Sequence, residues 1–410
     1  MKKTIRDLDL KGKRVVLRVD FNVPLSGGKV VDAKRIISAI PTINYILNCG
    51  ASLVILSHLS RIKNLDDKKK NSLRPVVQKF ANLTNRIVKF VNTTKGSIVR
   101  KAASELQPGE ILFLENTRFE DLNNKAESQN YEALAREWAS LGDIYINDAF
   151  ATAHRAHAST AGIANYINES AIGFLMLEEI DHLSKLLKSP KRPFVAIIGG
   201  AKVSDKIKVL EKLFNIADKV LIGGGMAYTF QKALGKEIGK SIYEPDLIEL
   251  AKKYLEQYKD KIVLPIDNGI SKEFADTPVK YTTPDAQNIP ADYMGLDIGP
   301  ETVKLFANEI SKAETIFWNG PLGVTEFSNY EMGTREVAIA IADNIKSYSV
   351  VGGGDSVTAI NKLGYQDKFS FISTGGGASI EFVQGKELPG IMAIQDKPTK
   401  KPVVMTKKED

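Results

Sequence analysis

Short apolar runs alternate with longer amphipathic segments along most of the chain. In the amino-terminal half, the runs KRVVLRVDFNVPL and ASLVILSHLSR, with shorter runs at Glu110–Leu114 and Asp143–Ile146, predict strands. Segments with helical spacing, such as Ala33–Leu47 and Tyr131–Leu141, lie between them. Strands that alternate with helices are typical of an α/β fold, here with mainly parallel sheets.

The carboxyl-terminal half repeats one pattern: an apolar run, a group of glycines and a helical segment. Glycine triplets occur in VLIGGGMAYTF, VVGGGDSVTAI and FISTGGGASIEF, and a doublet with two lysines occurs in FVAIIGGAKVSDKI. Glycines that precede a helix let backbone N–H groups approach an anion closely. One such turn would be explained as a tight connection, but several at the carboxyl ends of parallel strands converge on one crevice. The pattern therefore indicates a nucleotide site.

Two common phosphate motifs do not fit these glycines. A dinucleotide fingerprint needs a third glycine three residues after the second, where this chain has Tyr228, Val357 and Ile380. The sequence GKS at residues 239–241 resembles a P-loop, but the first glycine of that motif would fall at Leu234. Both classes are set aside.

The length of 410 residues, with 43% hydrophobic and 26% charged residues, suits two globular domains of roughly 200 residues each. The segment Glu178–Leu187 has helical apolar spacing, and Pro190 and Pro193 oppose its continuation. We expect a first domain at 1–177, a connecting helix and hinge at 178–190, and a second domain at 191–394. Residues 395–410 are lysine-rich and are expected to form a tail.

Composition narrows the classes of protein. No apolar run reaches the roughly 20 residues that span a bilayer, and the start lacks the apolar core of a signal peptide, so a cytoplasmic protein without a membrane partner is expected. A lone Cys49 and four dispersed histidines give no zinc motif. The net charge of +7 is spread over scattered lysines, which favours an anionic substrate over nucleic acid.

The first half brings cationic side chains to the ends of its predicted strands. They are Arg35, His58, Arg61, Arg118, His154 and Arg155. Arginine binds carboxylate or phosphate oxygens in a bidentate manner, so a cluster would suit a small phosphorylated acid. Taken singly, each has a structural explanation: Arg118 could pair with Glu120, for example, and His157 and His182 are assigned to structural roles.

Eight segments in this order resemble phosphoglycerate kinase: RVDFNVPL, SHLSR, LENTRF, NDAFATAHRAH, GGAKVSDK, WNGPLGVTE, GGGDS and STGGGAS. The resemblance runs from near the start to about Gly390. It implies two Rossmann-like lobes joined by a helix and hinge, with 3-phosphoglycerate on the first and ATP or ADP on the second. The implied reaction is reversible, Mg²⁺-dependent phosphoryl transfer between 1,3-bisphosphoglycerate and ADP, in a monomeric glycolytic enzyme that closes on its substrates.

The resemblance also implies roles for single residues. On the first lobe, Asp20 and Asn22 would hold the hydroxyl and carboxyl end of the glycerate, and Arg35 would lie nearest the reacting carboxyl. The basic patch for the phosphate would contain His58, Arg61, Arg118 and Arg155, with His154 beside them. Arg35 and Lys202 would stabilise the transferred group from opposite lobes.

On the second lobe, the implied nucleotide site divides into a phosphate part and an adenosine part. The phosphate part would contain Lys202, Lys206, Asn319, Gly354, Ser356, Gly376 and Gly377, with Asp355 holding Mg²⁺. The adenosine part would contain Gly200, Gly224, Met294 and Leu296 at the base and Glu326 at the ribose.

Three positions depart from the family pattern. Ser60 and Ala151 replace usual glycines, and Ile62 replaces a usual proline; the loop of Arg61 is most affected.

Two other functions stay open. A phosphotransferase for another small acid would keep the glycine turns without needing Asp20 and Asn22. A catalytically silent nucleotide- or nucleic-acid-binding protein is favoured only by the net charge.

Overall fold

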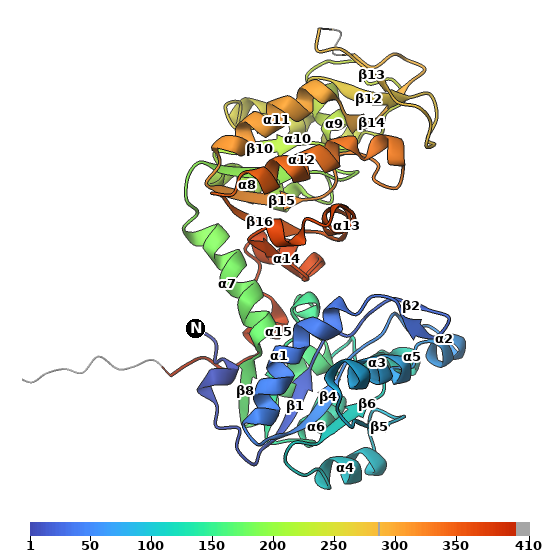
Figure 1. Cartoon of the computed structure of the whole chain (residues 1–410), viewed down its shortest axis with the longest axis vertical. Coiled ribbons are helices and arrows are strands. Elements are labelled where there is room, and N and C mark those ends of the chain that lie inside the picture. Colours follow the sequence, from blue (N-terminus) through green and yellow to red (C-terminus); the bar gives the residue numbers. More distant parts are fainter. Residues whose placement is uncertain (286–287, 399–410) are drawn as a thin grey trace, which may run out of the picture. The chain divides into compact units, whose positions relative to one another are not determined.

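The computed structural model describes residues 1–285 and 288–398. The chain forms two compact units. Unit 1 contains Met1–Glu178 and the described residues from Glu387 onward, and unit 2 contains Glu179–Lys386. The chain passes from unit 1 to unit 2 within helix α7 (Phe174–Lys188), shown in green in Figure 1. The helix expected at Glu178–Leu187 is thus present and begins earlier in the sequence.

Unit 1 is built on a six-stranded sheet in the order β5-β6-β4-β1-β7-β8. Its strands are β1 (Arg14–Arg18), β4 (Ser52–Leu56), β5 (Lys89–Val91), β6 (Ile111–Leu114), β7 (Ile144–Asn147) and β8 (Glu169–Ile172). Every neighbouring pair is parallel. Leu17, for example, pairs with Ile55 on one side and Ile146 on the other. All six strands therefore end at one edge of the sheet.

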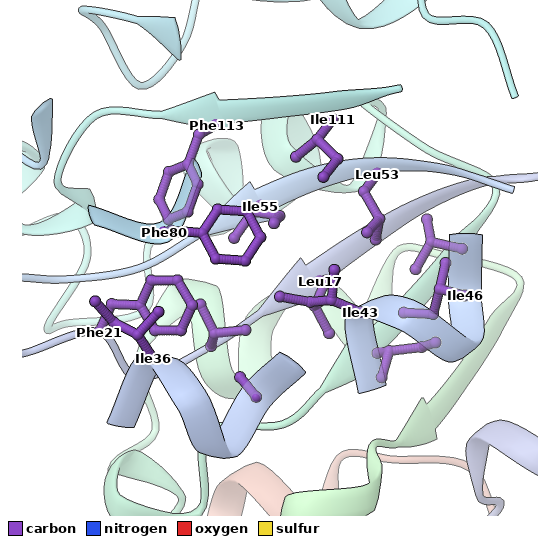
Figure 2. Packing of buried hydrophobic residues seen from close by; sticks show 14 of the residues in the cluster. Leu17, Phe21, Ile36, Ile43, Ile46, Leu53, Ile55, Phe80, Ile111 and Phe113 are labelled. Carbon is purple, nitrogen blue, oxygen red and sulfur yellow. The ribbon is translucent and has the colours of Figure 1, made fainter. Parts of the chain in front are cut away.

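Helices cover this sheet, and their apolar stripes form the core. Ile36, Ile43 and Ile46 of α1 and Phe80 of α3 pack against Leu17, Leu53, Ile55, Ile111 and Phe113 of the strands (Figure 2). The helices of unit 1 are α1 (Lys34–Asn48), α2 (Leu65–Lys70), α3 (Arg74–Thr84), α4 (Ser97–Ser104), α5 (Asp121–Asn124), α6 (Glu132–Ala139) and α15 (Pro389–Met392). Its shorter elements are a hairpin of β2 (Leu25–Ser26) and β3 (Lys29–Val30), and the turns η1 (Ile5–Asp7), η2 (Thr117–Glu120), η3 (Phe150–Thr152), η4 (Ala158–Gly162) and η5 (Ile163–Asn165).

Unit 2 repeats the architecture with a sheet in the order β11-β10-β9-β15-β16-β17. These parallel strands are β9 (Phe194–Ile198), β10 (Lys219–Ile222), β11 (Ile262–Val263), β15 (Thr315–Asn319), β16 (Tyr348–Gly352) and β17 (Phe371–Ile372). A small antiparallel sheet contains β12 (Asn268–Ser271), β13 (Lys280–Tyr281) and β14 (Met294–Ile298). The two parallel sheets confirm the predicted α/β fold.

The helices of unit 2 follow its strands. They are α8 (Ile207–Ile216), α9 (Met226–Ala233), α10 (Ile248–Gln257), α11 (Pro300–Lys312), α12 (Met332–Asp343), α13 (Gly354–Leu363) and α14 (Gly377–Val383), with the turns η6 (Pro245–Leu247), η7 (Ser328–Tyr330) and η8 (Gln366–Lys368). Helices α11 and α12 lie side by side (Figure 1). Phe306 of α11 and Ile341 of α12 belong to the same buried apolar cluster as Trp318 of β15. Within the described parts of both units, no helix has the length and apolarity to cross a membrane.

The end of the described chain lies in unit 1, whereas the sequence prediction placed residues up to 394 in the second domain. Gly390 N donates to Ala153 O at 2.8 Å, and Asn147 Nδ2 donates to Gly390 O at 3.1 Å. The expected tail also begins as paired chain, because Lys3 N donates to Gln395 O and Lys397 N to Met1 O, both at 2.8 Å. These backbone pairs join the two ends of the sequence, which composition alone could not indicate. Residues 399–410 of the expected tail lie outside the described residues.

Candidate active site

Adjacent strands of unit 1 deliver the residues predicted to bind the acid substrate. Asp20 and Asn22 follow β1, His58 and Arg61 follow β4, Arg118 lies on η2 after β6, and His154 and Arg155 follow β7. Because these strands are parallel neighbours, their connections leave the sheet at the same edge. The predicted long strands end early, at Arg18 and Leu56, and the remaining polar residues form these connections.

His58 is buried at this edge, and Arg18 determines which of its ring nitrogens carries the proton. Arg18 Nη2 lies 3.2 Å from His58 Nδ1, whereas the nearest oxygen of Asp20 is 3.7 Å from the same nitrogen. A guanidinium can only donate, so Nδ1 accepts and the ring proton is on Nε2. Burial, reinforced by Arg18 and Arg118, lowers the pKa of His58 well below its usual value. His58 is therefore a neutral hydrogen-bond donor.

Asp20 and Asn22 connect the loop after β1 to helix α1 and to the loop after β4. Arg35 Nη1, from the first turn of α1, donates to Asp20 Oδ2, and Asp20 Oδ1 accepts from Asn22 N at 3.1 Å. Asn22 Oδ1 in turn accepts from Ser60 N at 2.8 Å. The Asp20 side chain is 9% exposed and that of Arg35 is 35% exposed. The pair holds a half-exposed guanidinium over the edge of the sheet.

Asn116 joins the loop after β4 to the loop after β6. Its Nδ2 donates to Leu59 O at 2.7 Å, and its Oδ1 accepts from Leu59 N at 3.2 Å and Arg118 N at 3.1 Å. Arg118 Nη1 donates to Ser60 O at 2.8 Å. Arg118 thus bonds the neighbouring loop rather than Glu120, which instead pairs with Lys95 at 2.5 Å.

A pocket of about 650 Å³ opens beside these loops. Arg61, Arg118 and Arg155 line it, together with His157. The structural role assigned to His157 is therefore incomplete. Burial, with Arg118 and Arg18 nearby, lowers the pKa of His157 to about 3, so this ring is also neutral. His154 is not among the lining residues; its Nε2 accepts from Arg155 Nε at 3.1 Å.

Sequence reasoning missed a buried network beneath the cations. Arg18 Nε donates to Ser159 Oγ at 2.8 Å, and Ser159 donates to Glu127 from Oγ at 2.5 Å and from N at 2.9 Å. Burial raises the pKa of Glu127, against the effect of Arg18 and the Ser159 hydrogen bonds. The position of Arg18 inside an apolar strand was a sequence signal for its part in this network. Glu127 lies in a polar loop that carries no such signal.

The second site is a pocket of about 460 Å³ in unit 2. The predicted residues that line it are Gly200, Gly224, Met294, Leu296, Glu326 and Asp355. Tyr228, Lys240, Ile242 and Phe274 also line it and were not predicted. Apolar walls with a few polar groups suit a flat organic base.

Two glycines of this pocket are required by their backbone conformation, and one of them also by close backbone contact. Gly224 has φ +68°, and a Cβ there would lie 2.8 Å from both N and O of Gly200. Gly200 itself has φ +120°. Only glycine allows this conformation and approach at little cost, so the turns after β9 and β10 can meet.

The phosphate part of the predicted site lies at the ends of β9 and β15. Lys206 Nζ donates to Asn319 Oδ1, and burial lowers the pKa of Lys206. Asn319 Nδ2 is buried and has no acceptor among the described residues, as expected for a donor that awaits an anion. Ser356 Oγ accepts from Gly320 N at 2.8 Å. Lys202 is exposed and does not line the pocket.

The remaining glycines begin helices, as predicted. Gly354 starts α13 and Gly377 starts α14, with Gly376 at the N-cap of α14 in a positive-φ conformation of +54°. Free N–H groups in a first helical turn favour anions. Neither turn lines the pocket of unit 2 except through Asp355.

The donor set fits Mg²⁺ carried by a nucleotide. Asp355 is an exposed carboxylate in the first turn of α13 and lines the pocket. In residues 1–285 and 288–398, no group of three or more His, Cys, Asp or Glu side chains could hold a metal alone. Mg²⁺ commonly binds through one or two carboxylates together with substrate phosphates. Asp355 is therefore the residue that would hold it.

Comparison with known proteins decides the family. Residues 5–386 match the family model for phosphoglycerate kinase. The chain belongs to the phosphoglycerate kinase family. A phosphoglycerate kinase of Mesomycoplasma hyopneumoniae is 54% identical over 396 residues, 97% of this chain and 98% of the relative. One of Listeria innocua is 54% identical over 397 residues, 97% of this chain and all of the relative.

Solved phosphoglycerate kinases share the fold. The structure from Coxiella burnetii has a TM-score of 0.86 and 38% identity, and covers 96% of this chain and 98% of its own. That from Pyrococcus horikoshii has a TM-score of 0.81 and 32% identity, and covers 95% and 98%. The family, the fold class and the class of enzyme, a phosphotransferase of glycolysis with a carboxyl acceptor, are thereby confirmed. The roles of single residues stay predictions.

Proposed function

We propose that this phosphoglycerate kinase transfers a phosphoryl group directly between 1,3-bisphosphoglycerate and ADP, using Mg²⁺ and charge neutralisation. The separation of the two sites carries the proposal. In unit 1, cationic side chains lie at the carboxyl edge of the parallel sheet. In unit 2, glycine turns and an apolar pocket lie at the carboxyl edge of the second parallel sheet. One edge suits a small phosphorylated acid, and the other suits a nucleotide.

On unit 1, Arg61, Arg118 and Arg155 are proposed to bind the phosphate of 3-phosphoglycerate. His58 donates from Nε2, a role that its buried, neutral state supports. Asp20 and Asn22 hold the hydroxyl and carboxyl end. Arg35, held by Asp20, faces the reacting carboxyl.

On unit 2, the base occupies the pocket between Gly200, Gly224, Met294 and Leu296, and Glu326 binds the ribose. Lys202, Lys206 and Asn319 contact the phosphates, and the turns that begin α13 and α14 add N–H donors. The acceptor-free Asn319 Nδ2 supports this assignment.

The chemistry requires positioning and neutralised charge, with no nucleophilic side chain. The carboxylate and the ADP oxygen are both ionised near neutral pH, so a general base has no proton to remove. Preorganised cations stabilise the charge that develops on the transferred group, and we assign this role to Arg35 and Lys202. Bound Mg²⁺ would neutralise charge on the nucleotide oxygens.

Closure of the two units around both substrates is part of the proposal, because exclusion of water protects the transferring group. Small-angle scattering of the free and doubly liganded protein tests it. We expect a monomer of 45.1 kDa in both states and a smaller radius of gyration with both ligands. An unchanged radius would contradict closure.

The function itself is tested by Mg²⁺-dependent ATP consumption with 3-phosphoglycerate, coupled to reduction of the 1,3-bisphosphoglycerate formed. Activity should require both substrates and should fall about 10²–10³-fold in Lys202→Ala. Folded protein that binds ATP but shows no turnover with 3-phosphoglycerate would point to another small acid as substrate.

A further inference from the structure

Beneath the cations of unit 1, four side chains form a buried chain of hydrogen bonds that runs from Glu127 to His58. Glu127 and Ser159 are 0% exposed and Arg18 is 1% exposed. Glu127 lies between α5 and α6, Ser159 lies on η4, and Arg18 ends β1. None of these three residues lines the pocket of unit 1. Their effect on a bound substrate must therefore act through His58.

Glu127 turns the Ser159 hydroxyl so that its oxygen accepts from Arg18. Ser159 donates to Glu127 Oε1 from Oγ at 2.5 Å and to Glu127 Oε2 from N at 2.9 Å. A hydroxyl has one proton, so the lone pairs of Oγ are left for Arg18 Nε, which donates at 2.8 Å. Arg18 Nη1 donates to Val19 O. With Nε and Nη1 held, the planar guanidinium points Nη2 at His58 Nδ1, 3.2 Å away.

Glu127 also stabilises the buried guanidinium as a cation. Burial lowers the pKa of Arg18, and Glu127 opposes this effect more strongly than Asp20 or Tyr145. Both oxygens of Glu127 accept hydrogen bonds, as suits a carboxylate. A buried charge that loses its partner is strongly destabilised, so removal of Glu127 would favour movement of Arg18 away from His58.

His58 has a second possible arrangement if Arg18 moves. Asp20 Oδ1 lies 3.7 Å from His58 Nδ1 and could accept a proton from it. The hydrogen bond at one ring nitrogen determines which nitrogen carries the proton, so Nε2 would then become an acceptor. An acceptor at Nε2 repels a phosphate oxygen, whereas N–H at Nε2 binds it.

We propose that Glu127 and Ser159 are positioning residues for 3-phosphoglycerate, because they hold Arg18 against His58 Nδ1 and thereby keep the His58 proton on Nε2. The link to 3-phosphoglycerate rests on the proposed function, in which His58 donates to the substrate. The hydrogen-bond chain itself is independent of the identity of the substrate.

Nuclear magnetic resonance of ¹⁵N-histidine-labelled full-length protein at pH 7.5 tests the chain. The sequence contains four histidines, and His58→Gln assigns the signals of His58. In the wild type, Nε2 should carry the proton. In Glu127→Gln and in Ser159→Ala, the Nδ1 signal should shift toward that of a protonated nitrogen. A wild-type His58 protonated on Nδ1 would overturn the proposal even if neither variant folds.

Steady-state kinetics test the effect on the substrate. In both variants, the KM for 3-phosphoglycerate should rise about tenfold, the equivalent of one hydrogen bond to a charged group, while kcat and the KM for ATP stay unchanged. Removal of a negative charge alone would strengthen the binding of an anion. The direction of the change in Glu127→Gln therefore separates the two roles: a lower KM would show that Glu127 acts only through its charge, and would overturn positioning.

The matched control is Asp267→Asn in unit 2. Asp267 is also buried, and it accepts from Thr302 Oγ1 at 2.6 Å and Thr302 N at 2.7 Å, as Glu127 accepts from one serine. This control should keep the wild-type His58 signals and KM; equal changes in it would reveal only general destabilisation and overturn the proposal.

Failure of the chain and failure of the proposed function have different signatures. Unchanged His58 signals in folded Glu127→Gln and Ser159→Ala would overturn the chain. Changed signals with an unchanged KM for 3-phosphoglycerate would overturn the link to the substrate and place the error in the role assigned to His58. Lack of turnover in the wild type would refute the proposed function and leave the resonance test in force.

Discussion

Single residues at the edge of the unit 1 sheet are fixed by their partners before substrate binds. Arg35 is oriented by Asp20, His58 by Arg18, and Arg118 by the carbonyl of Ser60. Such preorganised donors stabilise developing charge without reorganising during the reaction. Their removal should therefore affect turnover more than stability.

Arg35→Ala and Lys202→Ala should each lower kcat by about 10²–10³-fold, since the loss of one donor aimed at the transition state costs roughly 3–4 kcal/mol. The coupled assay measures this, and circular dichroism should show an intact fold. Lys208→Ala, which removes an exposed lysine from α8 near Lys202, is the control and should keep wild-type kcat. Near-normal turnover of either test variant would refute its assignment.

Ser60 has φ +56°, a left-handed conformation that costs a residue with a Cβ roughly 1–2 kcal/mol. Glycine removes this strain, but it gives the unfolded chain more conformational freedom, which reduces the free energy of unfolding by about 0.5–1 kcal/mol. Ser60→Gly should therefore raise the free energy of unfolding by up to about 1 kcal/mol, measured by urea denaturation. Ser60→Ala keeps the strain and should give no increase; equal effects of both substitutions would show that strain is not the cause.

At the level of elements, the sheet order turns separate motifs into one site. The predicted strands and helices are largely present, with ends shifted by a few residues: Ala33–Leu47 is α1 at Lys34–Asn48, and Tyr131–Leu141 is α6 at Glu132–Ala139. The strand predicted from the run Lys13–Leu25 is longer than the observed β1, because β1 ends at Arg18, where the chain leaves the sheet. Local apolarity continues past that point, and only pairing with neighbouring strands determines where the ladder stops.

Asn116→Ala tests the coupling between two such elements. The substitution removes the bonds to Leu59 and Arg118, so it should raise the KM for 3-phosphoglycerate and lower the free energy of unfolding by about 3 kcal/mol, while the KM for ATP stays unchanged. The matched control is Asn344→Ala, because the Asn344 side chain of unit 2 also donates to two backbone carbonyls, Ile310 O and Ala313 O. It should reduce stability without the change in KM; an equal rise in KM would contradict a local role for Asn116.

For the whole molecule, buried titratable groups predict how stability depends on pH. His157 has a folded pKa of about 3, against about 6.5 in the unfolded chain. Between these values only the unfolded chain binds the proton, so stability is lost as pH falls below about 6.5, reaching a cost of about 2 kcal/mol at pH 5. Asp148, whose pKa burial raises to about 6, acts in the opposite direction, because the folded state takes up its proton first.

Urea denaturation at pH 7.5 and pH 5.0 separates the two contributions. The loss of stability on acidification should be about 2 kcal/mol smaller in His157→Gln than in the wild type, and larger in Asp148→Asn. Identical pH dependence of His157→Gln and the wild type would mean that His157 is accessible to protons in the folded state.

The sequence by itself determined the repeated units of this protein, because apolar periodicity, glycine turns and charged strand ends are local properties. It identified the family and several residues that line the two pockets, including Arg61, Arg118, Gly200 and Asp355. Tertiary structure decided what depends on contacts between distant segments. Glu127 became a buried counter-charge through Ser159, His157 became part of a pocket, and the described residues from Glu387 onward joined unit 1. These outcomes follow from burial and from contacts between residues that lie far apart in the sequence, which no local pattern records.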